Sequence, residues 1–175
     1  MSSASATELL KLLVMGGARS GKSRHALEVA RELGQSRAYV ATAEPLDDEM
    51  RERIQRHRDE RDPGWVNLEE PVEIVPLLTS ADVVIVDCLT LWLSNLLMRE
   101  RTDGQIMGEF GRLATAIIDA PNNIVLVTNE VGLGIVPQTP LGRRFRDLSG
   151  ALSQEVARSC SRVVMMCAGI ALQVK

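Results

Sequence analysis

A stretch near the N-terminus combines glycines, a lysine and a serine at a spacing suited to binding phosphate. It fits the pattern of a Gly, four free positions, a second Gly, a Lys and a Ser or Thr, and its residues are Gly16, Gly17, Ala18, Arg19, Ser20, Gly21, Lys22 and Ser23. Glycines allow the backbone to curl around a phosphate and to point several N–H groups at it. Lys22 can reach the β and γ phosphates of a nucleoside triphosphate, and the Ser23 hydroxyl can ligate Mg²⁺. The stretch therefore predicts a nucleotide phosphate site.

The residues on either side supply the strand and the helix that such a loop requires. The apolar run at residues 10–15 is typical of a buried strand, and residues 24–34 predict a helix that ends at a Gly. A helix that begins near Gly21 would direct the positive end of its dipole at the phosphates. The alternative is an ordinary Gly-rich turn, which would need neither flank, so the context favours the phosphate site.

A carboxylate at the end of another strand could complete a metal site. Asp87 ends the apolar run at residues 83–87. An acid in this position of a phosphate-loop protein commonly holds Mg²⁺, and it could also take a proton from an attacking hydroxyl. The alternative is an Asp that caps the next helix, since Thr90 and Leu91 follow closely. Because the nucleotide's Mg²⁺ needs a partner in the protein, we expect Ser23 and Asp87 to be its ligands.

A charged helix predicted over residues 45–61 carries a possible nucleophile. Met50, Ile54 and His57 follow an i, i+4, i+7 spacing, so they share one face of that helix. A neutral imidazole is a competent nucleophile toward phosphorus. Guanidinium groups suited to a polyphosphate surround it, from Arg53, Arg56, Arg58 and Arg61. The alternative is a partly buried, hydrogen-bonded His with no chemical role, which is what we expect of His25.

Composition limits the class of protein. The 175 residues, 45% of them hydrophobic, suffice for one domain over residues 1–175. A net charge of −3 and an aromatic content of 3% argue against nucleic acid as a partner. The apolar runs are too short for a membrane span, and residues 1–8, expected to be a disordered tail, lack signal-peptide features. The cysteines Cys88, Cys160 and Cys167 have no metal-ligand spacing, which indicates buried free thiols and a cytoplasmic location.

Apolar runs alternate with helical stretches, the pattern of an α/β protein with a mainly parallel sheet and helices on both faces. Further strands are predicted at residues 37–41, 83–87, 124–128 and 163–167, with an antiparallel edge strand at residues 171–174. Helices are predicted at residues 72–78, 89–98, 101–120 and from residue 139 or 141 to 161. Ligands of such sheets gather beyond the carboxyl ends of the strands. The polar residues there are Thr42, Glu44, Asp87, Thr128, Asn129 and Glu130.

Several other stretches carry expectations about packing and binding. Residues 65–71 are predicted to be an extended link between elements. The helix at residues 89–98 is apolar almost all round, so it is either deeply buried or part of a subunit interface, and we favour the interface. Residues 129–137 are too apolar for a solvated linker and are expected to fold over the site as a wall or lid. Arginines that open the last helix could clamp phosphates or be solvated surface groups, namely Arg143, Arg144 and Arg146.

Together, these stretches resemble one family, the bifunctional adenosylcobinamide kinase / adenosylcobinamide-phosphate guanylyltransferases of cobalamin biosynthesis. The matching stretches are residues 16–23, 41–43 with 47–50, 53–54 with 57, 87–95, 128–137, and 145–147 with 150. The phosphate loop alone would not separate this family from other kinases, whereas the order and spacing of all these stretches is specific. The resemblance runs from about Leu12 to the C-terminus.

The resemblance implies a phosphate-loop domain of the RecA type that carries out two reactions. The first phosphorylates the aminopropanol hydroxyl of adenosylcobinamide, a corrinoid, with ATP or GTP. The second transfers GMP from GTP to a histidine, releases pyrophosphate and passes the GMP to adenosylcobinamide phosphate, which gives adenosylcobinamide-GDP. Mg²⁺ is the expected cofactor, and a homo-oligomer such as a trimer is the expected assembly.

The resemblance also implies roles for particular residues. Only His57 can fill the place of the guanylylated histidine, because Arg56 stands where some relatives carry a second His. Thr42, Ala43 and Glu44 would line the nucleotide site. Glu69 follows Trp65 as an acid does in the family, so it is a candidate contact for guanine or ribose. Ser153 and Gln154 stand where relatives often have Asn and Gln, which weakens the case for an amide contact at position 153.

Rival functions share only part of this pattern. A P-loop small-molecule kinase without nucleotidyltransferase activity would need Lys22 and Asp87 but not His57. A regulatory GTPase would carry an Asn-Lys-x-Asp signature for guanine, which the sequence lacks. A RecA-like DNA motor is disfavoured by the acidic net charge and the few aromatic residues.

Overall fold

The computed structural model describes residues 9–59 and 61–175, without the side chain of Arg53. The tail expected at residues 1–8 thus lies outside the described residues, as does the side chain of Arg53, which was expected beside His57. The strands are β1 Lys11–Gly16, β2 Arg37–Ala41, β3 Trp65–Glu69, β4 Val83–Asp87, β5 Asn123–Asn129, β6 Arg162–Cys167 and β7 Ile170–Gln173. The helices are α1 Lys22–Leu33, α2 Asp48–Asp59, the 3₁₀ helix η1 Val75–Thr79, α3 Leu89–Met98, α4 Asp103–Asp119 and α5 Pro140–Ser159.

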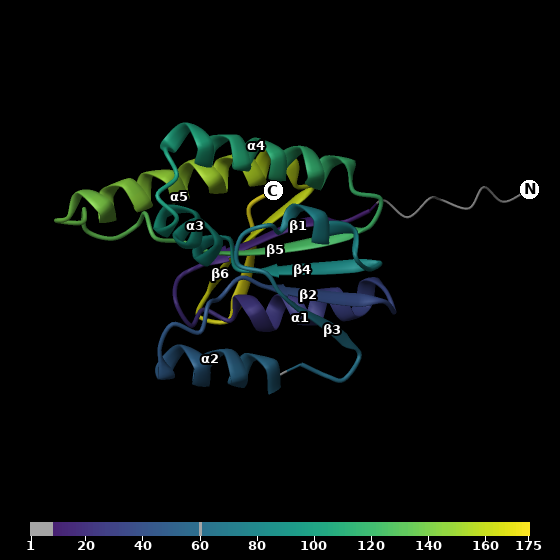
Figure 1. The fold of residues 1–175 in the computed structure, drawn as a ribbon. Coiled ribbons are helices and arrows are strands. Elements are labelled where there is room, and N and C mark those ends of the chain that lie inside the picture. Colours follow the sequence, from purple (N-terminus) through teal and green to yellow (C-terminus); the bar gives the residue numbers. More distant parts are fainter. Residues whose placement is uncertain (1–8, 60) are drawn as a thin grey trace, which may run out of the picture.

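The described strands form one seven-stranded sheet in the order β3-β2-β4-β5-β1-β6-β7. Every pair is parallel except β6 and β7, which pair antiparallel at the edge. The helices α3, α4 and α5 lie on one face of the sheet, and α1 and α2 lie on the other (Figure 1). The predicted α/β class, with a mainly parallel sheet and an antiparallel C-terminal edge strand, is confirmed.

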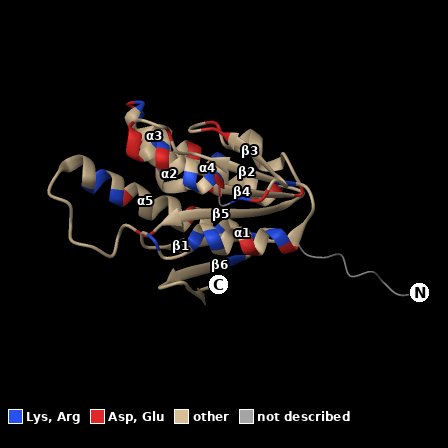
Figure 2. Cartoon of the chain, turned by 90° about the horizontal axis from the view of Figure 1, so that it is seen from below, with Lys and Arg blue, Asp and Glu red and all other residues tan. Residues whose placement is uncertain are grey.

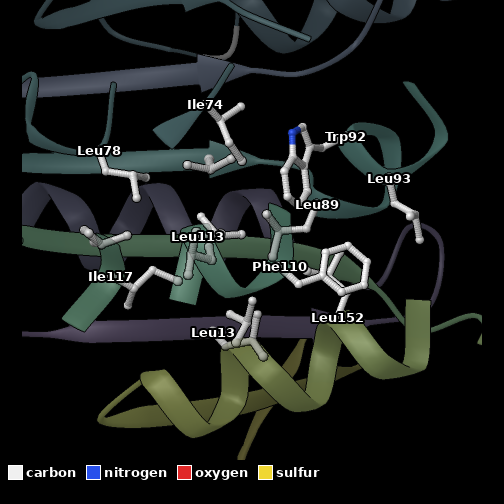
Figure 3. Packing of buried hydrophobic residues seen from close by; sticks show 14 of the residues in the cluster. Leu13, Ile74, Leu78, Leu89, Trp92, Leu93, Phe110, Leu113, Ile117 and Leu152 are labelled. Carbon is white, nitrogen blue, oxygen red and sulfur yellow. The ribbon is translucent and has the colours of Figure 1, made fainter. Parts of the chain in front are cut away.

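Both faces of the central strands are buried, which is why those strands are apolar without alternation. Along β4, Val84 and Val86 enter the core under α3, α4 and α5, whereas Val83 and Ile85 enter the core against α1. Figure 3 shows the first core, in which Leu13 of β1 and Trp92 of α3 are among the fully buried side chains. The carboxyl ends of β1, β2 and β4 consequently meet at one edge, which positions the site described below.

The apolar helix α3 is buried within the chain, so the interface that we favoured for it is wrong and deep burial is correct. Seven of its residues are buried: Leu89, Thr90, Trp92, Leu93, Asn95, Leu96 and Leu97. The helices α4 and α5 pack against it. The indole N–H of Trp92 donates to the carbonyl oxygen of Val72 at 2.7 Å, and its ring packs against Phe110. Burial of most of its residues explains why this helix has no polar face.

Two segments before β4 differ from the prediction. Residues 65–69, expected as part of an extended link, form the edge strand β3, because they pair with β2 and Trp65 packs edge-on against Tyr39. The helix expected at residues 72–78 is reduced to the short η1. Pro76 explains this difference, because it lacks an N–H for a longer helix and is accommodated only in the first turn.

The cysteines are free, and Cys88 and Cys160 are buried as predicted. Cys167 is exposed, which corrects the prediction for that residue. It ends β6 beside β7, whose residues are all exposed, so no helix covers it there. In the described part of the chain, no helix is both long and apolar enough to cross a membrane.

Candidate active site

The predicted phosphate loop connects β1 to α1 and is held tightly against the sheet edge. Gly16 has a φ of 149°, and a Cβ there would lie 2.5 Å from the carbonyl oxygen of Met166, so the position requires glycine. The backbone N–H of Gly169, in the turn between β6 and β7, donates to the carbonyl oxygen of Ser20 at 3.1 Å. Gly21 caps the N-terminus of α1. The loop thus directs the positive end of the α1 dipole toward its own concave side.

Lys22 lies across this loop rather than in solvent. Lys22 is only 7% exposed, and its Nζ donates to the carbonyl oxygen of Gly17 at 2.6 Å. Nζ also lies 3.5 Å from the Oγ of Ser20. An ammonium group in this position faces any phosphate that the loop binds.

A cavity of about 390 Å³ opens beside the loop and joins residues that are far apart in the sequence. It is lined by Ala18, Arg19, Ser20, Gly21, Lys22, Ser23, Arg24, Tyr39, Ala41, Ala43, Met50, Ile54, His57, Arg61, Asp87, Cys88, Leu91 and Asn129. The face of α2 predicted from spacing, with Met50, Ile54 and His57, is the face that lines it. The cavity therefore places a phosphate loop, a carboxylate and an imidazole around one volume.

Asp87 accepts a hydrogen bond from a residue that was not among the predicted site residues. The hydroxyl of Tyr39 donates to Oδ2 of Asp87 at 2.5 Å. Tyr39 pairs with Ile85 in the sheet, so its side chain lies on the same face as Asp87, two residues farther along β4. Burial, together with the charge of Asp87, raises the pKa of Tyr39 well above its ordinary value, so the phenol remains a donor. The available signal for Tyr39 was a polar ring in the middle of a buried strand.

The same tyrosine contacts Arg61, which follows the helix that carries His57. The guanidinium carbon of Arg61 lies 3.7 Å from the centre of the Tyr39 ring, within the range of a cation–π contact. Nε of Arg61 donates to the carbonyl oxygen of His57 at 2.8 Å, and another of its nitrogens donates to Asn67. Burial lowers the pKa of Arg61 from its usual value. Tyr39 thus connects the carboxylate of Asp87 to the C-terminal end of α2.

Ser23 and Asp87 provide hard oxygen donors on one cavity, which suits Mg²⁺. Within residues 9–59 and 61–175 there is no cluster of three or more His, Cys, Asp or Glu that could hold a metal by itself. Mg²⁺ usually binds through one or two protein ligands, waters and substrate phosphates rather than in an all-protein cage. The donors present therefore fit an ion that enters with a nucleotide.

Other predicted site residues lie outside the cavity lining, although Ala43 is part of it. Thr42 is buried, and its hydroxyl donates to the Cys88 carbonyl at 2.8 Å and accepts from the Cys88 N–H at 2.9 Å. Glu44 pairs with Arg99 at 3.0 Å. The carboxylate of Glu69 pairs with Arg58 of α2. Thr42 thus joins the ends of β2 and β4, and the contact roles of Thr42, Glu44 and Glu69 stay predictions.

The segment expected to cover the site extends away from it. Leu133 is 87% exposed and Ile135 is 96% exposed, and of residues 129–137 only Asn129 lines the cavity. Figure 1 shows this segment projecting beyond the sheet together with the first turns of α5. The arginines there are engaged locally, Arg143 with the carbonyls of Pro137 and Gln138 and Arg144 with Asp103. Among the described residues the segment is therefore neither wall nor lid, because its apolar side chains are exposed and lie outside the cavity lining.

Comparison with known proteins gives consistent matches along the chain. The sequence profile of the CobU family, described as cobinamide kinase / cobinamide phosphate guanyltransferase, matches residues 12–174. The bifunctional adenosylcobalamin biosynthesis protein CobP of Pseudomonas aeruginosa is 43% identical, with 93% of this chain and 96% of that protein covered. The proteins named CobU of Salmonella typhimurium and Escherichia coli are 38% and 37% identical, each with 95% of this chain and 100% of the relative covered.

A solved structure supports the fold independently of sequence. The RadB recombinase is similar with a TM-score of 0.51 at 14% identity, and the match covers 89% of this chain and 73% of that one. At such low identity the likeness concerns the fold alone. It agrees with the expected RecA-type arrangement around a phosphate loop.

Proposed function

Because this chain belongs to the CobU family of cobinamide kinases and cobinamide phosphate guanyltransferases, we propose that the cavity between its phosphate loop and α2 serves both reactions. The protein is a bifunctional enzyme of cobalamin biosynthesis. It phosphorylates a cobinamide and then joins GMP to the phosphate product. The observation that carries the proposal for the site is that Lys22, Asp87 and His57 line one volume.

In the kinase reaction, the residues around the loop would bind ATP or GTP by its phosphates. The backbone N–H groups of the loop and the ammonium of Lys22 would neutralise the β and γ phosphates. Mg²⁺ held by Ser23 and Asp87 would supply further positive charge against them. Asp87 would also orient the cobinamide hydroxyl and accept its proton as the oxygen attacks the γ phosphorus. The bond from that phosphorus to the β-phosphate oxygen breaks, and the nucleoside diphosphate leaves.

In the guanylyl reaction, an imidazole nitrogen of His57 would attack the α phosphorus of GTP. The N–P bond forms, the bond to the β-phosphate oxygen breaks, and pyrophosphate leaves the loop. A phosphate oxygen of cobinamide phosphate then attacks the same phosphorus, so the N–P bond breaks and His57 is regenerated. A simple kinase would need no imidazole at this position, and the relatives that cover 93–95% of the chain are named bifunctional.

Incubation with GTP labelled at the α phosphate tests the proposal. We expect the full chain with Mg²⁺ to take up the label in a form stable to base and labile to acid, as a phosphoramidate is. GTP labelled at the γ phosphate should leave no label, because pyrophosphate departs. Adding adenosylcobinamide phosphate should remove the α label from the protein. If the protein never takes up α label, the histidine intermediate is contradicted, and the kinase reaction is the part of the proposal that still stands.

Replacement of Tyr39 by phenylalanine should lower kcat/KM about tenfold in both reactions, the effect of one hydrogen bond to a charged group. The change removes the donor to Asp87 but keeps the ring under Arg61. The matched variant Arg61→Met keeps the Tyr39 hydroxyl and loses the contacts to the end of α2. It should therefore slow α-label uptake. The rate of cobinamide phosphorylation should stay within about threefold of the wild-type rate, a loss of less than 1 kcal/mol of transition-state stabilisation. Steady-state kinetics of both reactions measure these effects. If the two variants slowed the kinase reaction equally, the prediction would be wrong.

Other parts of the proposal rest on the family. We propose that the corrinoid enters the open side of the cavity, that Glu69 contacts guanine or ribose once Arg58 releases it, and that the enzyme works in the cytoplasm. A homo-oligomer such as a trimer is also proposed. The exposed apolar side chains on residues 133–141 support it, and sedimentation velocity would test it.

A further inference from the structure

A second cavity, of about 600 Å³, lies against the phosphate loop, and none of the steps described above uses its walls beyond the loop itself. It shares the loop residues Arg19, Ser20 and Gly21, and also Arg24, with the first cavity. Its other walls are the side chains of Leu27 and Arg31 on α1 and the turn at Ala168 and Gly169 between β6 and β7. A triphosphate held on the loop can therefore extend in two directions, toward α2 or toward α1 and this turn.

The two reactions require opposite orientations of the triphosphate. The γ phosphate must face the acceptor in the kinase reaction, whereas the α phosphate must face His57 in the guanylyl reaction. Asp87 and His57 both line the first cavity, so both attacks come from that side. The nucleoside of the phosphoryl donor must then lie on the opposite side of the loop, away from Asp87. On that side the structure provides the second cavity.

The lining of the second cavity suits a nucleoside. Its volume is within the range of small-ligand sites, about 300–1,000 Å³. Arg19, Arg24 and Arg31 line it, and none of the described acidic residues does. Guanidinium groups stack on the faces of aromatic rings and donate hydrogen bonds to ribose and phosphate oxygens. In Figure 2, α1 carries both basic and acidic residues, and Glu28, which does not line the cavity, lies 3.9 Å from Arg24.

The turn that closes the cavity is anchored to the loop. The N–H of Gly169 is bonded to Ser20, and Gly169 has no side chain to occupy the space beside Arg24. The base can thus approach the backbone of the turn while the phosphates stay on the loop. Leu27 provides an apolar surface beneath it.

From these observations we infer that the second cavity binds the nucleoside of the phosphoryl donor, and that GTP bound for guanylyl transfer points the other way along the same loop. The inference rests on the proposed function, because it uses His57 as the nucleophile. It accounts for one phosphate loop that presents the γ phosphate to one acceptor and the α phosphate to another.

Photoaffinity labelling of the full chain with 8-azido-ATP and Mg²⁺ tests the position of the base directly. We expect cross-links in peptides that contain residues 24–31 or 167–170. Excess ATP should prevent them. Cross-links confined to peptides of α2 or β2 would overturn the inference, and so would labelling that ATP does not prevent.

Replacement of Arg31 by alanine supplies a kinetic test, since Arg31 lines the second cavity and not the first. The KM for ATP in cobinamide phosphorylation should rise three- to tenfold, with kcat, inhibition by inorganic tripolyphosphate and α-label uptake from GTP unchanged. Asp62→Asn is the matched control, because it removes the ion pair between Arg31 and Asp62 without altering the cavity lining. An equal rise of the KM for ATP in the two variants would overturn the inference. So would a weakening of tripolyphosphate inhibition as large as the rise of the KM for ATP. Wild-type protein without α label would instead contradict the proposed function.

Discussion

Replacement of His57 by alanine is expected to abolish the uptake of α label from GTP and the transfer of GMP to adenosylcobinamide phosphate. Removal of a nucleophile typically lowers such a step by about 10⁴–10⁶-fold, which is below detection in a labelling assay. Phosphorylation of adenosylcobinamide should stay within about threefold of the wild-type rate, which corresponds to a loss of less than 1 kcal/mol of transition-state stabilisation. His57 lines the cavity, but the kinase attack is on the γ phosphate and needs no imidazole.

The matched control is His25→Ala. His25 lies on α1, one turn beyond the loop, and does not line the cavity. This variant should retain α label and both activities. Retention of α label by His57→Ala would contradict the role of His57, and mapping of the labelled peptide would then show which residue carries the GMP.

Replacement of Lys22 by alanine is expected to reduce both reactions by about 10²–10³-fold, because each reaction develops negative charge on phosphates held by the same loop. Because Lys22 is buried against the loop, a cation from the solvent does not replace its ammonium group in the variant. Nucleotide affinity should fall as well, which calorimetric titration with GTP would measure. The two activities should fall together, since one cradle serves both.

A second buried lysine provides the control for loss of folding. Lys11 lies at the start of β1, far along the strand from the loop, and its Nζ donates to the carbonyl oxygen of Ala120 at 2.7 Å. Its Nζ also donates to the carbonyl oxygen of Asn122, so its role there is structural, and burial lowers its pKa. Lys11→Ala should lower the free energy of unfolding by about 1–3 kcal/mol, because carbonyl groups lose their donor, while kcat of the folded protein is kept. If Lys22→Ala keeps either activity, that reaction does not use the loop.

The local patterns were sufficient for most elements of the sheet. β2, β4 and α3 begin and end where they were predicted, because buried strands and an apolar helix have strong and continuous signals. β3 was missed as a strand. This strand lies at the edge of the sheet and is partly exposed, as at Val66. Its sequence therefore lacks the apolar run that marks the central strands. Pro76 was the available sign that the helix expected before β4 would be short.

The candidate site was anticipated where one short segment carries the information. The spacing of glycines with Lys22 predicted the loop, and helical spacing predicted that Met50, Ile54 and His57 share a face. Tyr39 was missed because its importance depends on Asp87, a residue on the neighbouring strand. Glu69 was predicted from the family alone, and the structure pairs it with Arg58.

The amino-acid sequence alone determined the phosphate loop, the alternation of strands and helices and the inward face of α2, because each depends on residues that are neighbours in the chain. Tertiary structure decided which segments meet: the order of the strands, the contact of Tyr39 with Asp87 and Arg61, the burial of α3 within the chain, and the second cavity behind the loop. These features depend on contacts between residues far apart in sequence. Such contacts form only when the chain packs both faces of one sheet, so no local pattern of residues encodes them.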